Sequence, residues 1–276
     1  MRDQIPLQKD GFMLIIAERI NASRKQIALA IGSGDRPFIQ EEVKAQTQAG
    51  AHYIDVNAGT FVGGEADKLK WIVEAVQEVT DLPLSIDSPD AEVIKAVMPL
   101  LKKTPLINSI TLEPSRIEGI LPLVVEHKTK VIALCQSEQG SAETTERKVS
   151  LAGQLVEKLT GAGVPLDDVY IDPLVFPLST DPQSANATLV AIGEIMKKFP
   201  GVHTICGLTN VSFGLPARKL VSRAFLAAAI SKGLDSAIID PTDKLLYAML
   251  KAATLVAGKD DFCMDYIRAF RERRLE

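Results

Sequence analysis

The sequence predicts a single-domain α/β protein with the (β/α)₈ fold, or TIM barrel. Short apolar runs alternate with longer amphipathic stretches, and eight such pairs fit within about 245 of the 276 residues. The runs are apolar almost throughout, as parallel strands are when both of their faces are buried. No G-x-G-x-x-G motif follows the first run, which disfavours a doubly wound sheet. We expect one domain over residues 1–276, with a short N-terminal extension at 1–12 and a charged C-terminal tail at 259–276.

The eight expected strands are brief. The first is the run MLIIA and the fourth is only LIN. A polar or turn-forming residue follows most of the runs and marks their carboxyl ends. In chain order, the expected strands cover residues 13–17, 52–56, 82–86, 106–108, 130–135, 168–172, 203–207 and 236–240.

The stretches between the strands have the spacing of amphipathic helices. In the second stretch, Leu69, Ile72 and Val73 fall on one helical face. Glycine follows several stretches, as is common after a helix, and Pro99 bends or ends the third. In chain order, the expected helices cover residues 37–49, 67–80, 90–101, 115–127, 145–160, 184–199, 217–232 and 242–258.

Composition excludes several classes of protein. The net charge is -4 and aromatic residues make up 5%, so the chain lacks the basic surface and the stacking platforms of nucleic-acid binders. No apolar run is long enough for a membrane span or a signal core. Cys135, Cys206 and Cys263 are far apart, which predicts buried free thiols in a reducing cytoplasm. We expect a cytoplasmic protein that binds neither nucleic acid nor membrane.

Polar side chains follow nearly every expected strand, at the end where a TIM barrel carries its active site. Most of them are carboxylates or carboxamides, which accept hydrogen bonds or both give and accept them. Such a ring suits a flat, neutral ligand with many amide-like groups. The residues at these ends are Glu18, Asn21, Asp55, Asn57, Asp87, Ser88, Asn108, Ser109, Gln136, Asp172, Asn210, Ser212 and Asp240.

Some of these acids have a second interpretation, because aspartate at a strand-to-helix junction is a common helix N-cap. Capping is the favoured interpretation for Asp240, which precedes Pro241, and an alternative for Asp87. Capping does not suit Asp172, since Pro173 and a long loop follow it. A ligand or structural hydrogen bond is the remaining role for Asp172.

Other kinds of active site lack their parts. His52 and His203 fall at strand starts, opposite the expected site, and His127 lies near a helix end, so no zinc site is expected. No metal held by the protein is expected. There is no G-x-S-x-G nucleophile elbow and no Walker-type lysine loop. The strand ends carry no lysine, which disfavours Schiff-base chemistry.

Several segments together resemble a known family. The segments are AERIN (17–21), YIDVNAG (53–59), SIDSPD (85–90), INS (107–109), YIDPL (170–174) and GLTNVSFGLPARKLVSRAFL (207–226). In this order and spacing they resemble the pterin-binding methyltransferases. The closest likeness is to methyltetrahydrofolate:corrinoid-protein methyltransferases, including the tetrahydrofolate methyltransferases of demethylase systems. The resemblance extends over about residues 13–265.

The resemblance implies a barrel that binds tetrahydrofolate or 5-methyltetrahydrofolate as substrate at its carboxyl-end mouth. It implies methyl transfer between this folate and the cobalt of a cobalamin supplied by a separate corrinoid protein. A homodimer is also implied. The transfer from methylcobalamin to tetrahydrofolate in a demethylation pathway is the favoured direction.

The resemblance also implies roles for individual residues. Asp87, Asn108, Asp172 and Gly207 would bind the pterin. Asn210 would lie near the ring nitrogen that carries the methyl group and act as the catalytic residue, and Arg218 would pack on or near the pterin face. A carboxamide at that nitrogen stabilises the positive character that develops as the methyl group transfers. The alternatives are a turn-forming role for Asn210 and a solvent-facing position for Arg218.

Two other functions remain open on the sequence alone. One is a condensing enzyme like dihydropteroate synthase, which needs a basic diphosphate site that this rim lacks. The other is a non-catalytic folate-binding subunit of a corrinoid complex. Separately, Leu220, Phe225, Leu226 and Ala229 form either a dimer face or the stripe by which their helix packs on the barrel, and packing is the favoured interpretation.

Overall fold

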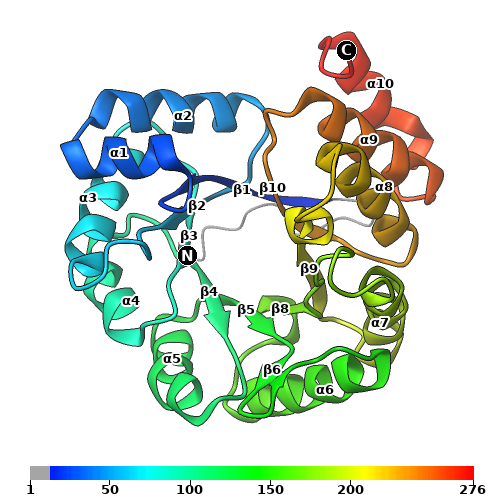
Figure 1. Cartoon of the computed structure of the whole chain (residues 1–276), viewed down its shortest axis with the longest axis horizontal. Coiled ribbons are helices and arrows are strands. Elements are labelled where there is room, and N and C mark those ends of the chain that lie inside the picture. Colours follow the sequence, from blue (N-terminus) through cyan, green and yellow to red (C-terminus); the bar gives the residue numbers. More distant parts are fainter. Residues whose placement is uncertain (1–12) are drawn as a thin grey trace.

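The computed structural model describes residues 13–276, and they form a closed barrel of eight parallel strands inside a ring of helices (Figure 1). The strand order around the barrel is β1-β10-β9-β8-β5-β4-β3-β2. The barrel strands are β1 (Leu14–Asn21), β2 (Tyr53–Asn57), β3 (Leu84–Asp87), β4 (Leu106–Ile110), β5 (Lys130–Leu134), β8 (Val169–Asp172), β9 (His203–Gly207) and β10 (Ser236–Ile239). This confirms the predicted fold class. The expected extension at 1–12 lies outside the described residues.

The helices cover the outside of the barrel, and each predicted helix is present within a few residues. They are α1 (Lys25–Ser33), α2 (Arg36–Gln48), α3 (Glu65–Gln77), α4 (Ala91–Val97), α5 (Pro114–His127), α6 (Thr145–Gly161), α7 (Ser184–Lys198), α8 (Arg218–Ser231), α9 (Lys244–Val256) and α10 (Met264–Arg271). Within residues 13–276, no helix is long and apolar enough to span a membrane.

Three local features were not predicted. Helix α1 lacks a side-chain N-cap and contains Gly32, so it has no start signal that sequence inspection would recognise. Strand β1 continues to Asn21, four residues beyond the apolar run. A small hairpin of β6 (Gln136–Ser137) and β7 (Gly140–Ser141) extends β5 at the mouth of the barrel.

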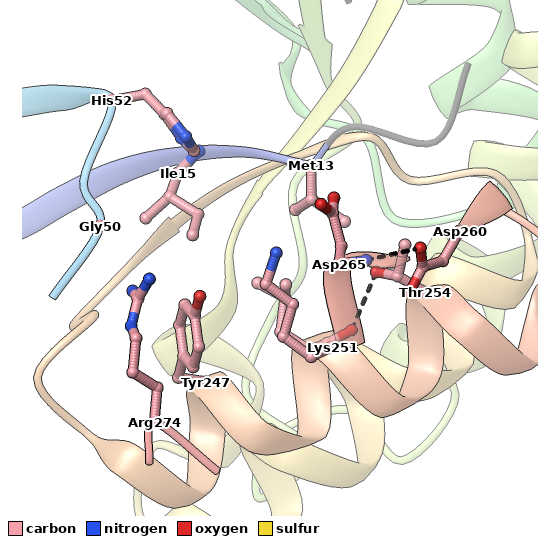
Figure 2. Close-up of a pocket in the computed structure, with 11 residues that line it drawn as sticks. Met13, Ile15, Gly50, His52, Tyr247, Lys251, Thr254, Asp260, Asp265 and Arg274 are labelled. Atoms are coloured by element: carbon pink, nitrogen blue, oxygen red, sulfur yellow. Dashed lines mark hydrogen bonds between the residues drawn. The ribbon is translucent and has the colours of Figure 1, made fainter. Parts of the chain in front are cut away.

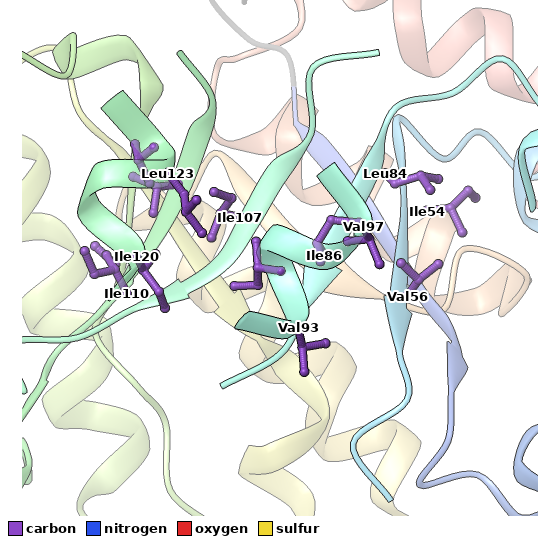
Figure 3. Packing of buried hydrophobic residues seen from close by; sticks show 14 of the residues in the cluster. Ile54, Val56, Leu84, Ile86, Val93, Val97, Ile107, Ile110, Ile120 and Leu123 are labelled. Atoms are coloured by element: carbon purple, nitrogen blue, oxygen red, sulfur yellow. The ribbon is translucent and has the colours of Figure 1, made fainter. Parts of the chain in front are cut away.

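Strand alternation separates two layers of apolar packing. Side chains such as Ile54, Ile86 and Ile107 belong to the outer cluster, and Figure 3 shows Ile86 beside Val97 of α4 and Ile107 beside Leu123 of α5. The next residues along the strands, among them Tyr53 and Leu106, point inward. The inner layer comprises Leu14, Ile16, Tyr53, Leu106, Ile132, Tyr170 and Ile205, and all are buried. The barrel is therefore a packed core below its mouth.

The C-terminal segment is more ordered than the predicted charged tail. Asp260 accepts hydrogen bonds from the backbone N–H groups of Asp265 and Tyr266, which starts α10. After α10, the Arg274 guanidinium donates to the Ala49 carbonyl at 2.6 Å and lies 4.2 Å from the ring of Tyr247. Figure 1 shows α10 outside α9 at the rim of the helix ring. The segment at 259–276, which was expected as a charged C-terminal tail, contains a helix and is held in place by these caps and contacts.

Two predictions about side-chain burial are only partly right. Cys135 and Cys206 are buried free thiols, but Cys263 is exposed in the turn before α10. On α8, Phe225, Leu226 and Ala229 are buried against the barrel, as expected for a packing stripe. Leu220, at the first turn of α8, is instead 68% exposed.

A cluster of polar side chains around His203 lies at the amino-terminal end of the barrel. His203 begins β9, and its ring stacks on Tyr170 with 4.8 Å between centroids. Its Nδ1 lies 2.7 Å from Asp235 and its Nε2 lies 3.2 Å from Asp167. Burial opposes the charged form, but the two carboxylates outweigh it and hold the pKa of His203 above its usual value of 6.5. As predicted, His203 lies at a strand start, away from the mouth.

This cluster predicts pH-dependent stability. Because the pKa of folded His203 is raised, its contribution is complete below about pH 6.5 and is lost as the pH rises through the folded pKa. We expect His203→Phe, which keeps the stacked ring, to lower the free energy of unfolding by about 1–3 kcal/mol in mild acid. Denaturant unfolding should show that the difference in the free energy of unfolding between the wild type and His203→Phe becomes smaller toward alkaline pH. The exposed His127→Gln variant is the control, and a difference that does not change with pH would contradict the prediction.

Candidate active site

The mouth of the barrel receives its polar side chains from the same alternation that builds the core. Asp55 on β2 follows the inward-pointing Tyr53 by two residues, and Asp172 on β8 follows Tyr170 in the same way. On adjacent strands, Asp87 is in register with Asn108. The inner layer thus changes from apolar to polar toward the carboxyl ends, where the active site of a TIM barrel lies.

A hydrogen-bond network joins the ends of β2, β3 and β4. Ser85 Oγ donates to Asp55 at 2.6 Å, and Asn108 Nδ2 donates to the same oxygen at 3.2 Å. Asn57 Nδ2 donates to Asp87 Oδ2 at 3.0 Å. Asp55 is 2% exposed and lies beneath Asn108, so it orients that amide. Asp87 and Asn108 are only partly buried and remain accessible at the mouth.

Burial raises the pKa values of the acids at the mouth toward neutral pH. It raises the pKa of Asp87 to about 6 against the opposing hydrogen bond from Asn57, and it raises the pKa of Asp55 well above the ordinary value. Burial likewise raises the pKa of Glu18 to about 7, although the Arg24 guanidinium opposes this shift. Such shifted acids cluster at functional sites more often than on ordinary surfaces.

Asp172 occupies the end of β8 and is 6% exposed. Its Oδ1 accepts the backbone N–H of Leu174 at 2.8 Å. Burial raises the pKa of Asp172 to about 6; the N–H groups of Leu174 and Gly207 and the charge of Lys148 all act in the opposite direction. As expected, Asp172 does not cap a helix. It forms a tight turn at the mouth.

Asn210 lies on the short 3₁₀ turn Leu208–Ser212 that follows β9. It is exposed, and a Cβ built on Gly207 would lie 3.6 Å from its Nδ2. Within residues 13–276, the side-chain amide of Asn210 makes no hydrogen bond, so it is available to a ligand. The turn-forming alternative accounts for its backbone, whose carbonyl accepts the N–H of Phe213 at 3.1 Å.

Arg218 supports this turn from the start of α8. Its guanidinium donates to the Thr209 carbonyl at 3.1 Å and to Ser212 Oγ at 3.4 Å. The guanidinium also lies 5.3 Å from the ring of Phe213. Arg218 is exposed and holds the Thr209 carbonyl next to Asn210; its contact with the pterin face stays a prediction.

Three further residues of the rim form hydrogen bonds with neighbouring groups of the protein. Ser212 is fully buried and donates to the Thr209 carbonyl, so the prediction that it lines the site is wrong. Gln136 Nε2 donates to Glu113, and its Oε1 accepts from Ser141, which braces the hairpin. Asn21 Oδ1 accepts the N–H of Ser23 in the loop after β1.

The two possible helix caps are also resolved. Asp240 pairs with Arg19 at 2.9 Å and accepts the N–H of Thr242, but it does not cap a helix. The N-cap of α9 is Asp243. The N-cap of α4 is Asp90, which leaves Asp87 to the network at the mouth.

Sequence inspection missed Lys148, which reaches the mouth from the first turn of α6. It is fully buried and donates to the backbone carbonyls of Ala142, Pro173 and Leu174. Its position could have drawn attention to it, because it precedes Ala152 by four residues on the buried face of α6. The expectation that no lysine lies at the strand ends considered only residues next to the strands.

A cavity of about 130 Å³ lies at the opposite end of the barrel, between the start of β1 and helix α9. Figure 2 shows Lys251 and Arg274 on either side of Tyr247 in its wall. His52 lines the same cavity, and burial lowers its pKa to about 4, assisted by the charges of these two residues. The cavity is remote from the acids and amides of the mouth and does not belong to the candidate site.

A family model described as pterin binding enzyme matches residues 18–240. The chain belongs to the pterin-binding enzyme family. The match begins at Glu18, spans Asp87, Asn108, Asp172 and Asn210, and ends at Asp240. It confirms the resemblance that the sequence motifs suggested.

Two curated relatives of this pterin-binding enzyme are informative. The methylcorrinoid:tetrahydrofolate methyltransferase of Eubacterium limosum is 38% identical over 265 residues, covering 95% of this chain and 98% of the relative. The methionine synthase of Mycobacterium tuberculosis is 35% identical over 250 residues, covering 85% of this chain. The matched region is only 21% of that much longer protein.

Solved structures of dihydropteroate synthases share the fold of this pterin-binding enzyme. The Coxiella burnetii enzyme, in complex with pteroic acid, aligns with a TM-score of 0.71 and 16% identity over 89% of this chain and 93% of its own. The Xanthomonas albilineans enzyme, with 4-aminobenzoic acid, aligns with a TM-score of 0.70 and 18% identity over 91% of this chain and 93% of its own. At these identities the likeness establishes the barrel fold alone.

Burial of the Asp172 carboxylate at the mouth should lower the free energy of unfolding at neutral pH. The pKa of Asp172 is raised to about 6, so its ionised form is disfavoured in the folded chain above that pH and the penalty disappears below about pH 4. We expect Asp172→Asn to raise the free energy of unfolding by about 1–2 kcal/mol at pH 7.5, and by less in acid. Denaturant unfolding at both pH values checks this, with the exposed Asp81→Asn as control. A loss of stability at pH 7.5 would contradict it.

Proposed function

We propose that this protein is a methyltransferase that moves a methyl group between tetrahydrofolate and the cobalt of a cobalamin carried by a separate corrinoid protein. The observation that supports this most strongly is the 38% identity, over 98% of its length, to the methylcorrinoid:tetrahydrofolate methyltransferase of Eubacterium limosum. A likeness over nearly the full length of both chains favours a shared reaction over a shared fold.

The chemistry of the mouth suits the pterin ring. We assign the recognition of its edge to Asp87, Asn108 and Asp172, which project from β3, β4 and β8. The 2-amino pyrimidinone edge of a pterin presents N–H donors to carboxylates, and the amide of Asn108 can both donate and accept. Gly207 leaves room beside them, because it places no side chain between Asp172 and Asn210.

We assign the catalytic role to Asn210. When tetrahydrofolate accepts the methyl group, its ring nitrogen gains positive charge and then loses its proton. In the reverse direction, the nitrogen takes up a proton as its bond to the methyl group breaks. The exposed carboxamide of Asn210, which has no partner among residues 13–276, can hydrogen-bond to that nitrogen in both directions of transfer. It would stabilise the transition state more than the ground state, because the charge on the nitrogen develops only as the bond to the methyl group changes.

The cobalamin, when present on its own protein, supplies the cobalt that donates or accepts the methyl group. The residues of this chain bind and orient the folate and leave the mouth open to the corrinoid protein. We favour the transfer from methylcobalamin to tetrahydrofolate, in a demethylation pathway, because the Eubacterium limosum relative bears that name. A cytoplasmic location fits the free thiols Cys135 and Cys206.

The assignment predicts the effect of Asn210→Ala. Loss of the carboxamide should slow folate-dependent demethylation of methylcobalamin by about 10²–10³-fold, as the loss of one preorganised hydrogen-bond donor does elsewhere. Binding of tetrahydrofolate should weaken much less. The assay follows the methylcobalamin spectrum under anaerobic conditions, with the corrinoid protein or free methylcobalamin as donor.

Thr209→Val is the matched control, because its exposed side chain adjoins Asn210 on the same turn. Tight folate binding without turnover on any corrinoid donor would favour a non-catalytic folate-binding subunit. Condensation of a pterin diphosphate with 4-aminobenzoate would favour a dihydropteroate-synthase-like enzyme. Absence of folate binding would exclude the whole proposal.

We further propose that the protein is a homodimer that pairs through α9. Leu245, Met249 and Val256 follow one face of this helix and are 58%, 38% and 88% exposed. An apolar stripe of this kind is suited to a two-fold interface, in which each copy covers the same residues of the other.

The dimer proposal predicts that Val256→Glu yields a folded monomer. A buried, unpaired carboxylate at a self-complementary interface costs more than the contacts of one valine provide. Sedimentation velocity should report a dimer for the wild type and a monomer for the variant. Val62→Glu, at a residue that is 96% exposed in the loop after β2, is the matched control. A wild-type monomer, or an unchanged dimer in Val256→Glu, would contradict the proposal.

A further inference from the structure

Lys148 is a buried cation whose three protons are all used. It is 0% exposed, and its Nζ donates to the carbonyls of Ala142 at 2.8 Å, Pro173 at 2.8 Å and Leu174 at 2.5 Å. No carboxylate among residues 13–276 forms an ion pair with it. An ammonium with three acceptors has no lone pair for nucleophilic chemistry, so Lys148 does not form a Schiff base. The cost of burying this charge requires another explanation.

Two of the three carbonyls belong to the turn that contains Asp172. Leu174 has a φ of 56°, in the left-handed region, which is strained for a residue with a Cβ. In this conformation the Leu174 N–H points back to Asp172 Oδ1, and the Leu174 carbonyl points to Lys148 and to Thr188 Oγ1. Lys148 thus holds the carbonyls of the strained turn, while the Leu174 N–H of the same turn holds the Asp172 carboxylate.

The third carbonyl belongs to a different part of the mouth. Ala142 directly follows the β6–β7 hairpin, which extends β5. The ammonium therefore joins the loop after β5 to the loop after β8, and these two loops flank Asp172. This position also places a positive charge near the carboxylate. That charge opposes the effect of burial on the pKa of Asp172 and favours its ionised form.

We propose that Lys148 is a positioning residue for the folate substrate, which acts by fixing the turn at residues 172–174 that presents Asp172. The proposal rests on the proposed function, in which Asp172 binds the pterin edge. A carboxylate accepts two N–H groups of such an edge, whereas a protonated carboxyl group accepts them less well. Lys148 would then influence binding without touching the ligand.

The test measures the affinity for tetrahydrofolate between about pH 5.5 and 8.5 in Lys148→Met and Lys148→Gln. The wild type should lose affinity as the pH falls through about 6, where both Asp172 and Asp87 titrate, and only the contribution of Asp172 should respond to Lys148. In both variants we expect the midpoint to shift to higher pH by about one unit. This shift lowers the affinity roughly twofold at pH 7 and approaches about tenfold in acid, because one pKa unit is a tenfold change in the ionisation constant. The exposed Lys158→Met, on the same helix, should behave as the wild type.

A double variant separates positioning from general loosening of the fold. In an Asp172→Asn background, which has no titrating group at this position, Lys148→Gln should produce no further pH shift. Circular dichroism confirms folding. If Lys148→Met does not fold, Leu174→Gly is added to remove the backbone strain.

Each result is decisive. Folded Lys148 variants that bind tetrahydrofolate with the wild-type affinity and pH profile would overturn the proposal, as would a uniform loss of affinity at all pH values. Failure of every Lys148 variant to fold would also overturn it, in favour of a purely structural lysine. If the wild type does not bind tetrahydrofolate, the proposed function itself fails.

Discussion

The two-residue period of a strand inside a closed barrel determines where this protein can carry chemistry. Tyr53 and Tyr170 point into the barrel, so the residues two positions later, Asp55 and Asp172, must do so as well. The same strands thus supply an apolar plug at one end and a polar ring at the other. The helices outside pack on the intervening residues, which are apolar on most strands.

A polar ring built on a packed core is costly, and the structure shows how the cost is distributed. Burial raises the pKa values of Asp55, Asp87 and Asp172, and each carboxylate receives hydrogen bonds from side chains or backbone N–H groups that oppose the shift. Lys148 adds a buried positive charge near the last of them. The pKa of Lys148 is lowered, because burial outweighs the nearby acidic groups that favour its charged form.

Sequence patterns were sufficient for the barrel because strands and helices are encoded locally. The residues at the ends of β3, β4 and β8 could be identified for the same reason: the last residue of an apolar run lies at the mouth whatever else surrounds it. Long-range partners are not encoded in this way. Nothing near Asp240 in sequence indicates that it binds Arg19 rather than a helix, and nothing near Lys148 specifies the carbonyls of Pro173 and Leu174. Contacts of the C-terminal segment were not predicted for the same reason, because Arg274 donates to a distant group, the Ala49 carbonyl.

The two turns that carry Asp172 and Asn210 are bound to each other as well as to the barrel. The N–H of Leu178 donates to the Val211 carbonyl at 3.0 Å, and Ser179 Oγ donates to the Phe213 carbonyl at 2.7 Å. The loop after β8 and the turn after β9 therefore form one framework, which Lys148 holds from α6 and Arg218 holds from α8. The first turn carries Asp172, which is assigned to pterin binding, and the second carries Asn210, which is assigned to catalysis. A shift of one loop therefore moves both residues. These hydrogen bonds between the loops fix the position of Asp172 relative to Asn210. A ligand bound by Asp172 is therefore held at a defined position beside Asn210.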